Sequence, residues 1–256
     1  MKSTFLIAIY TCLAVVAVSP VQAQERAFNF ALRGGVAVAP AYPGSGNYRV
    51  GPNLAFTFGS LRWGGHKIGN GIGVPPKSGL ALRGAIRVLG AREQADHNEL
   101  AGLADIDRAI EIGLGLNYRK EKWQVFGEVR KGVTGHSGVT GTLAGEVVFR
   151  PADRWTIFAG PRVSFGDREF ANTYFGVAGA EATTSQFGAY SAGGGALAVG
   201  FNVRASYRFS EVWALEGALE YEKLLNDAAN SPITSVGSDD QWQLRIGLNR
   251  TFTLQF

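Results

Sequence analysis

The sequence predicts an all-β protein, a transmembrane antiparallel up-and-down β-barrel of ten or twelve strands. Three observations predict this fold class. Segments of about ten residues alternate between apolar and polar side chains, the connections between them alternate between short and long, and 35 of the 256 residues are glycine. A hydrophobic fraction of 46% together with a net charge of only +4 excludes a disordered chain.

Residues 1–23 contain, in order, the three parts of a secretory signal peptide. Lys2 provides the positive charge, Phe5–Val18 is apolar, and the segment ends in Val21-Gln22-Ala23, which suits cleavage. The apolar stretch is shorter than the roughly 20 residues of a spanning helix, which disfavours an uncleaved anchor. We therefore expect a single outer-membrane barrel domain over residues 24–256. The only cysteine, Cys12, lies in the signal, so the exported chain forms no disulfide.

Eleven segments of the exported chain are candidate strands, whereas single-chain bacterial barrels have an even number. The number becomes ten if residues 61–77 hold no transmembrane strand. It becomes twelve if they hold two, or if Asn172–Ala178 adds one. The candidate strands are residues 28–40, 50–59, 61–68, 79–90, 107–119, 122–131, 139–150, 154–165, 195–209, 211–224 and 241–255.

The alternation gives each strand one apolar row and one row of glycine and polar residues. In a soluble β-sandwich the apolar rows would share a core, but in a membrane barrel they face lipid, and the polar rows face the lumen. The clearest apolar rows are Ile110, Ile112, Leu114, Leu116 and Tyr118; Leu197, Val199, Phe201, Val203, Ala205 and Tyr207; Trp213, Leu215, Gly217, Leu219 and Tyr221; and Trp242, Leu244, Ile246 and Leu248.

Aromatic residues and connection lengths give the barrel an orientation. Aromatic side chains near segment ends are expected to form girdles at the two membrane surfaces, and short connections are expected to be periplasmic turns. The aromatic residues are Trp123, Trp155, Trp213, Trp242, Tyr118, Tyr207, Phe209 and Phe256. The short connections are residues 119–121, 151–153 and 210–211, and the long ones, expected outside the cell, are residues 92–105, 166–194 and 226–240.

Charged residues of both signs are predicted to face the lumen. We expect most of them to pair across the interior, because side chains must fill a barrel of this size. The alternative is a narrow polar pore or a ligand cleft. The predicted row comprises Glu111, Glu128, Glu146, Arg162, Arg204, Arg208, Glu216, Glu220 and Arg245.

No residue pattern predicts a catalytic, cofactor-binding or metal-binding site. His136 and Ser137 are adjacent, and neighbouring residues of a strand point to opposite faces, so they would not form a base and nucleophile there. We expect instead a tight turn in which Gly132, Gly135 and Gly138 have positive φ.

Metal and nucleic-acid binding are also disfavoured. His66 and His97 lie far apart in the sequence, so they do not have the spacing of metal ligands. The group of Asp105, Asp107 and Glu111 is more typical of a polar loop that enters a strand than of a calcium site. Without its signal the chain has 24 basic and 21 acidic side chains, a surplus of +3 (24 − 21), which is too small to suggest nucleic-acid binding.

Turns are predicted at Gly44, Gly46, Gly51 and residues 193–195.

Six short motifs follow one another along the exported chain. They are Pro40–Ser45, Arg92-Glu93 with Leu100–Asp107, Gly135–Gly138, Thr173–Val177, Tyr190–Gly195 and Ser231–Ile233. Together they resemble the MipA/OmpV family of outer-membrane proteins, and the resemblance covers essentially the whole exported chain. The family is named for a scaffold that binds a murein-degrading lytic transglycosylase.

The resemblance implies an outer-membrane scaffold that is not an enzyme and needs no cofactor. Its periplasmic turns would contact murein-remodelling enzymes, such as a lytic transglycosylase or a penicillin-binding protein. A narrow porin or small-solute uptake channel is the alternative function, and a lipid hydrolase is a third. Outer-membrane lipids and lipopolysaccharide would surround the barrel.

The C-terminus, Arg250–Phe256, resembles the signal that the barrel-assembly machinery reads, with a final aromatic residue and alternating apolar positions. Arg250 departs from this pattern, because it occupies a position where an apolar side chain is usual. Two explanations are open: its guanidinium extends to the lipid headgroups, or a bulge shifts the register of the strand.

Overall fold

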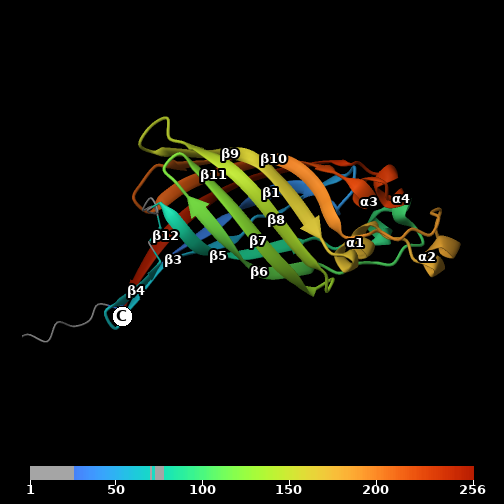
Figure 1. Cartoon of the computed structure of the whole chain (residues 1–256), viewed down its shortest axis with the longest axis horizontal. Coiled ribbons are helices and arrows are strands. Elements are labelled where there is room, and N and C mark those ends of the chain that lie inside the picture. Colours follow the sequence, from blue (N-terminus) through green and yellow to red (C-terminus); the bar gives the residue numbers. More distant parts are fainter. Residues whose placement is uncertain (1–25, 70, 73–77) are drawn as a thin grey trace, which may run out of the picture.

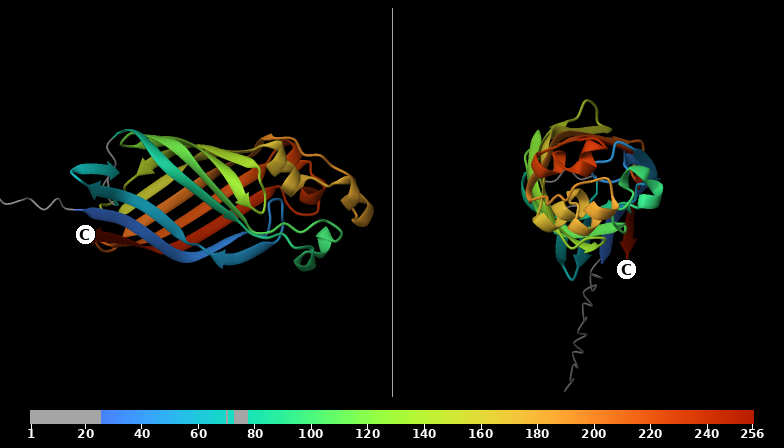
Figure 2. Two further views of the ribbon diagram at one scale, coloured as in Figure 1. Left: turned by 90° about the horizontal axis from the view of Figure 1, so that it is seen from below. Right: turned by 90° about the vertical axis from the view of Figure 1, so that its right-hand side faces the viewer.

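The computed structural model describes residues 26–69, 71–72 and 78–256. The predicted signal peptide, residues 1–23, and Cys12 lie outside the described residues. One antiparallel sheet curls around an elongated interior, with the helices gathered at one end (Figure 1). Seen along its long axis, the sheet forms a ring (Figure 2). No helix in the described part of the chain is long and apolar enough to cross a membrane.

Twelve strands form this sheet in the order β4-β3-β1-β12-β11-β10-β9-β8-β7-β6-β5, and β2 pairs with β1. From residue 79 onward, every predicted strand is confirmed to within three residues at each end. The strands are β1 (Ala27–Pro40), β2 (Tyr48–Pro52), β3 (Ala55–Trp63), β4 (His66–Gly69), β5 (Gly79–Leu89), β6 (Ala109–Arg119), β7 (Trp123–Thr134), β8 (Val139–Phe149), β9 (Trp155–Gly166), β10 (Gly195–Arg208), β11 (Trp213–Leu224) and β12 (Asp240–Gln255).

The N-terminal strands differ from the prediction. β2 and β3 pair one after the other with the same edge of β1, so they behave as a single interrupted strand. Their break lies at Asn53-Leu54, and a turn at Gly64-Gly65 leads into the four-residue β4, whereas a single break near residue 60 was predicted. Counting β2 and β3 as one position and leaving β4 aside, the described sheet has ten strand positions. Asn172–Ala178 adds no strand, because most of it belongs to a helix.

Short helices occupy the long connections at the end away from the C-terminus (Figures 1 and 2). Since short turns face the periplasm, the end that holds Phe256 is the periplasmic one and the helical end is external. The α-helices are α1 (Arg168–Phe175), α2 (Gly179–Thr184), α3 (Asn226–Ala229) and α4 (Pro232–Ser235), and the 3-10 helices are η1 (Gln94–Asp96) and η2 (Asn98–Leu100).

The apolar rows face outward, as predicted. Leu114 of β6 is 69% exposed and Leu82 of β5 is 80% exposed, and such contiguous apolar surface suits lipid rather than water. Leu197 is an exception, because it was predicted to face lipid but is only 5% exposed. The pairing of β10 with β9 shifts between Ala196 and Ala198, which lets Leu197 pack under the helices instead.

Aromatic residues cluster at both ends of the barrel, which confirms the predicted girdles. At the periplasmic end, the rings of Tyr118 and Trp123 are 5.7 Å apart and those of Trp155 and Tyr207 are 4.9 Å apart. At the external end, Trp242 lies 4.6 Å from Tyr221.

The register of β12 is continuous through Arg250, so the strand has no bulge at this residue. Its guanidinium lies 5.2 Å from the ring of Trp213 and 4.9 Å from that of Phe252. Arg250 therefore belongs to the periplasmic girdle, where its charge rests against two aromatic rings.

Candidate functional site

A folded layer covers the external end of the barrel, and we call it the cap. It is built from the connections β1–β2, β5–β6, β9–β10 and β11–β12, which contain every described helix (Figures 1 and 2). Two clusters of buried side chains hold these connections together, so the cap has apolar cores of its own. One comprises Ile106, Phe170, Ala171, Tyr174, Phe175, Ala192, Leu197, Ala198, Leu224 and Ala228. The other comprises Ala41, Tyr42, Leu100, Leu103, Val177, Phe187 and Ile233.

All six motifs found in the sequence lie in the cap or at the strand ends that support it. The Tyr42 hydroxyl of the first motif donates to Glu99 Oε1 at 3.2 Å, beside the second motif. The Ser231 hydroxyl of the last motif donates to the carbonyl oxygen of Phe175, in the fourth motif, at 2.7 Å. Segments far apart in the sequence meet here because alternate connections of an up-and-down barrel share one end. The alternation of short and long connections predicted that the long ones share the external end, but no sequence pattern indicated how they pack against one another.

Arg92 connects the β5–β6 connection to helix α1. Its side chain is almost fully buried, and Nη1 donates to the carbonyl oxygen of Tyr174 at 3.0 Å, near the C-terminal end of α1. Nη2 reaches the carbonyl oxygen of Ala104 at 3.5 Å. Burial lowers the pKa of the Arg92 guanidinium, and the negative charge of Glu181 opposes this effect. A cation at the C-terminal end of a helix also interacts favourably with its dipole.

Replacing Arg92 with alanine is expected to loosen the cap while the barrel stays folded. The loss of charged hydrogen bonds to two buried carbonyl groups should cost about 2–3 kcal/mol locally. Hydrogen exchange of peptides from residues 168–194 should accelerate, and the heat-modifiable gel shift of the barrel should persist. Arg108→Ala, at an exposed position of the same connection, is the matched control. Unchanged exchange in the Arg92 variant would contradict this role.

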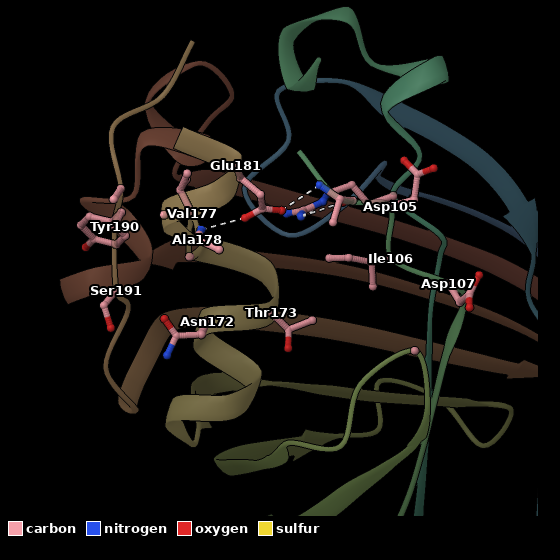
Figure 3. A pocket seen from close by; sticks show the side chains of 16 residues that line it. Asp105, Ile106, Asp107, Asn172, Thr173, Val177, Ala178, Glu181, Tyr190 and Ser191 are labelled. Carbon is pink, nitrogen blue, oxygen red and sulfur yellow. Dashed lines mark hydrogen bonds between the residues drawn. The ribbon is translucent and has the colours of Figure 1, made fainter. Parts of the chain in front are cut away.

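A cavity of about 810 Å³ opens between the connections of the cap (Figure 3). Asp105, Ile106 and Asp107 stand on one side of it, and Tyr190 and Ser191 stand on the other. Asn172, Thr173, Val177, Ala178 and Glu181 lie between these two walls (Figure 3). Residues from four of the six motifs therefore line one space.

Beneath the cap, the fully buried carboxylate of Glu111 binds two arginines. Arg87 forms two hydrogen bonds with it, at 2.8 Å and 2.6 Å, and Arg130 Nε donates to Oε2 at 3.0 Å. The hydroxyl of Thr140 donates to Oε2 at 2.9 Å. The Nε2 atom of His136 lies 3.2 Å from Oε1 of Glu111. This cluster joins strands β5 to β8 at the point where the lumen meets the cap.

His136 and Ser137 lie in the loop between β7 and β8, where the strand argument does not apply, and their side chains have different partners. The ring of His136 is buried against Phe170 and Tyr174, and Nδ1 accepts a hydrogen bond from the backbone N–H of Gly138 at 3.1 Å. Burial lowers the pKa of His136, although the charge of Glu111 acts in the opposite direction. The exposed Ser137 hydroxyl donates to Glu169 instead. The structure therefore does not form a histidine-activated serine at this pair.

The glycines of this turn were predicted to share positive φ, and this is wrong for two of them. Only Gly135 has positive φ, at 73°. Position 132 requires glycine because a Cβ there would overlap the carbonyl oxygen of His136. At Gly138 a Cβ would press against the backbone of Phe170 in α1. Close approach of chain segments, rather than turn conformation, thus requires these two residues.

Within the described residues, no group of three His, Cys, Asp or Glu side chains could hold a metal ion. Asp105 and Glu111 do not converge, because Glu111 binds arginines in the lumen and Asp105 Oδ1 accepts the backbone N–H of Gln94 at 2.7 Å. His97 lies in the cap, with its ring 4.9 Å from that of Tyr42, whereas His66 belongs to β4 at the periplasmic end.

Most of the predicted lumen charges pair, as expected. Several pairs join strands that are separated by one intervening strand, so the side chains extend over the inner face of the sheet. The ion pairs are Arg87–Glu111, Arg130–Glu111, Arg83–Glu128, Arg130–Glu128, Arg204–Glu146, Arg162–Glu220, Arg245–Glu220, Arg162–Glu222 and Arg33–Glu216. Arg208 differs from the others, because it is exposed near the end of β10.

Known structures give low-similarity matches, and no curated protein matches the chain. The N-terminal β-barrel domain of OprF from Pseudomonas aeruginosa is 12% identical over 69% of this chain and 98% of that one, with a TM-score of 0.31. OprG from the same organism is 11% identical, with coverages of 89% and 97% and a TM-score of 0.29. The toluene transporter TbuX of Ralstonia pickettii is 11% identical, with coverages of 92% and 90% and a TM-score of 0.32. Likeness at this level says nothing about function.

A family model gives a direct assignment. The model described as MltA-interacting protein MipA matches residues 32–252, a range that runs from β1 to β12 and includes the whole cap. With its lipid-facing apolar rows, its two aromatic girdles and its ion-paired interior, the chain is an outer-membrane β-barrel protein that belongs to the MipA (MltA-interacting protein) family.

Proposed function

We propose that this protein is a sealed outer-membrane scaffold that holds a murein-remodelling enzyme at its periplasmic end. The observation that carries the proposal is the match to the MltA-interacting protein family over residues 32–252. The partner class follows from the resemblance noted in the sequence, which implies a murein-degrading lytic transglycosylase. Murein lies on the periplasmic side of the outer membrane, so the partner must dock at the end away from the cap.

The hairpin of β3 and β4 is the feature of the periplasmic end best suited to such contact. It lies beside the C-terminus at the far end of the barrel from the cap (Figure 1). Gly64 and Gly65 form its turn with φ of 58° and 81°, a conformation that favours glycine. The exposed Lys67 follows this turn, and the guanidinium of Arg26 lies 4.3 Å from the ring of Trp63. This basic rim complements an acidic partner surface.

Site-specific photo-crosslinking in intact envelopes tests the proposal. A photoreactive side chain at Lys67 is expected to capture a lytic transglycosylase or a penicillin-binding protein. The same side chain at Gly188 is the control, because this exposed cap position has open space around it. Capture of murein enzymes from Gly188 but not from Lys67 or from Asp153, in another periplasmic turn, would overturn the proposed docking end.

A narrow solute channel is the competing function. A channel requires a continuous path of water. The pairs Arg162–Glu220 and Arg33–Glu216 each hold lumen side chains together over one intervening strand, and the cap lies over the external mouth. These contacts support a sealed barrel. Steady single-channel conductance of the purified protein in planar bilayers would contradict the scaffold proposal and favour the channel.

A further inference from the structure

The cap cavity has the size and composition of a small-molecule site. Its volume of about 810 Å³ falls within the range of roughly 300–1,000 Å³ found for ligand pockets. Buried apolar residues form part of its lining, since Ile106 and Val177 are 7% and 3% exposed. Carboxylate, hydroxyl and amide groups stand around them (Figure 3). The space therefore offers both apolar contact and several directed hydrogen bonds.

The hydrogen bonds of the cap leave some of these polar groups available. Each carboxylate oxygen of Glu181 already accepts one hydrogen bond, Oε1 from the backbone N–H of Ala104 and Oε2 from that of Ala178, both at 2.7 Å. Asn172 Oδ1 accepts the backbone N–H of Ala192 at 2.9 Å, which leaves its NH₂ group. The structure describes no hydrogen bond or ion pair for the exposed carboxylate of Asp107.

Arg92 adds a buried donor that has no acceptor in the described part of the chain. The residue lines the cavity and is 3% exposed, and its two terminal nitrogens bind the carbonyl oxygens of Tyr174 and Ala104. Its Nε–H is buried without a partner among the described residues. An unsatisfied buried donor costs about 1–3 kcal/mol. Nε is closed to solvent, so a ligand oxygen would satisfy it only where the side chains around it move aside.

The charges and geometry exclude several ligand classes. Asp105, Asp107 and Glu181 supply three negative charges against the single positive charge of Arg92, so phosphate and other anions are repelled. A chelated metal ion does not fit, because no described set of three acidic or histidine side chains converges on one point. A purely apolar ligand would strip water from the carboxylates without replacing their hydrogen bonds.

From these contacts we infer that the cap cavity is a binding site for a saccharide without negative charge. Sugar hydroxyls would donate to the carboxylates of Asp105 and Asp107. The NH₂ group of Asn172 would donate to a hydroxyl or acetamido oxygen, and the Nε–H of Arg92 would do so where the side chains around it move aside. The apolar face of a sugar ring would pack on Val177. This function is independent of the proposed murein-enzyme docking, which uses the opposite end of the barrel.

Two variants, each with a matched control, test whether binding takes place in the cavity. Gly179→Trp places a bulky side chain at the lining of the cavity, and its Cβ meets no atom within 4 Å, so folding should be retained. Gly188→Trp is its control, because this cap glycine is equally open but does not line the cavity. Asp107→Asn removes the available carboxylate, and Asp96→Asn makes the same change at an exposed cap position outside the lining.

Binding is measured by isothermal titration of the full exported chain, folded in detergent micelles and checked by its heat-modifiable gel shift. The probes are chitotriose as a neutral N-acetylated glycan, lipid-free core oligosaccharide of lipopolysaccharide after dephosphorylation, maltotriose, spermidine and inorganic phosphate. The wild-type chain is expected to bind chitotriose or the core oligosaccharide, and the better probe identifies the source. Gly179→Trp should weaken binding at least about tenfold and Asp107→Asn by about fivefold, with both controls within about twofold of wild type.

Three results would overturn the inference. The first is that the folded wild-type chain binds none of the three saccharides. The second is that a saccharide binds but Gly179→Trp and Asp107→Asn bind it as tightly as their controls. The third is preferential binding of spermidine or phosphate, which would show that charge rather than hydroxyl recognition governs the cavity. None of these results depends on whether a murein enzyme is captured from Lys67.

Discussion

Replacing Glu111 with alanine is expected to lower the free energy of unfolding by about 3–5 kcal/mol, because the buried Arg130 and the partly exposed Arg87 would lose their shared carboxylate. Arg130 is 4% exposed, and Arg87 forms a two-bond contact with Glu111. The loss should appear as a lower urea midpoint in lipid vesicles, followed by tryptophan fluorescence. The cap should loosen at the same time, since His136 and Tyr174 stand over this cluster.

Two further variants separate the charge cluster from a general effect of losing a carboxylate. Glu121→Ala lies in an exposed periplasmic turn and should shift the midpoint little. In a double-mutant cycle, combining Arg87→Met with Glu111→Met should recover part of the lost free energy of unfolding, because fewer uncompensated charges remain when both members of the pair are removed. A Glu111→Ala barrel as stable as Glu121→Ala would show that the arginines are solvated rather than dependent on Glu111.

Gly160→Val is expected to prevent the barrel from folding. A Cβ at this lumen-facing position of β9 would overlap the carbonyl oxygen of Gly145 in β8, and backbone atoms cannot move aside as a flexible side chain can. Overpacking of this kind costs about 3 kcal/mol or more. The variant should lose the heat-modifiable gel shift and become sensitive to protease in the membrane fraction.

Gly84→Val provides the matched comparison. Gly84 faces lipid on β5, and a Cβ there meets no atom within 4 Å, so the same substitution should leave folding intact or improve it slightly. If Gly160→Val folded as well as Gly84→Val, close approach of β8 and β9 would not be the reason for glycine at this position.

The family-typical motifs change meaning once the fold is known. From the sequence, Pro40–Ser45 and Ser231–Ile233 are two unrelated turns separated by most of the chain. In the structure they belong to one layer, and Ile233 is fully buried in the same apolar cluster as Tyr42. The motifs therefore describe an external cap, whereas the predicted contact with murein enzymes concerns the opposite, periplasmic end.

The sequence by itself determined the strands and their faces. Rows such as Ile110 to Tyr118 and Trp242 to Leu248 alternate with period two, and this pattern fixes which side chains meet lipid and which meet the lumen. It also predicted the paired lumen charges, since a narrow barrel leaves an ionised group such as Glu146 or Arg162 little choice except a partner of opposite sign. Local periodicity carries this information because each strand position depends on its immediate neighbours in the chain.

Only the tertiary structure decided the cap, its cavity and the role of Arg92. The burial of Arg92 depends on Tyr174 and Ala104, and no periodic pattern connects those positions. The same holds for Leu197, which a shift in strand pairing removes from the lipid-facing row, and for the interrupted N-terminal strand. Long connections have no repeating pattern of their own, so their conformation is set by contacts between segments far apart in sequence that meet only after the barrel brings its strand ends together.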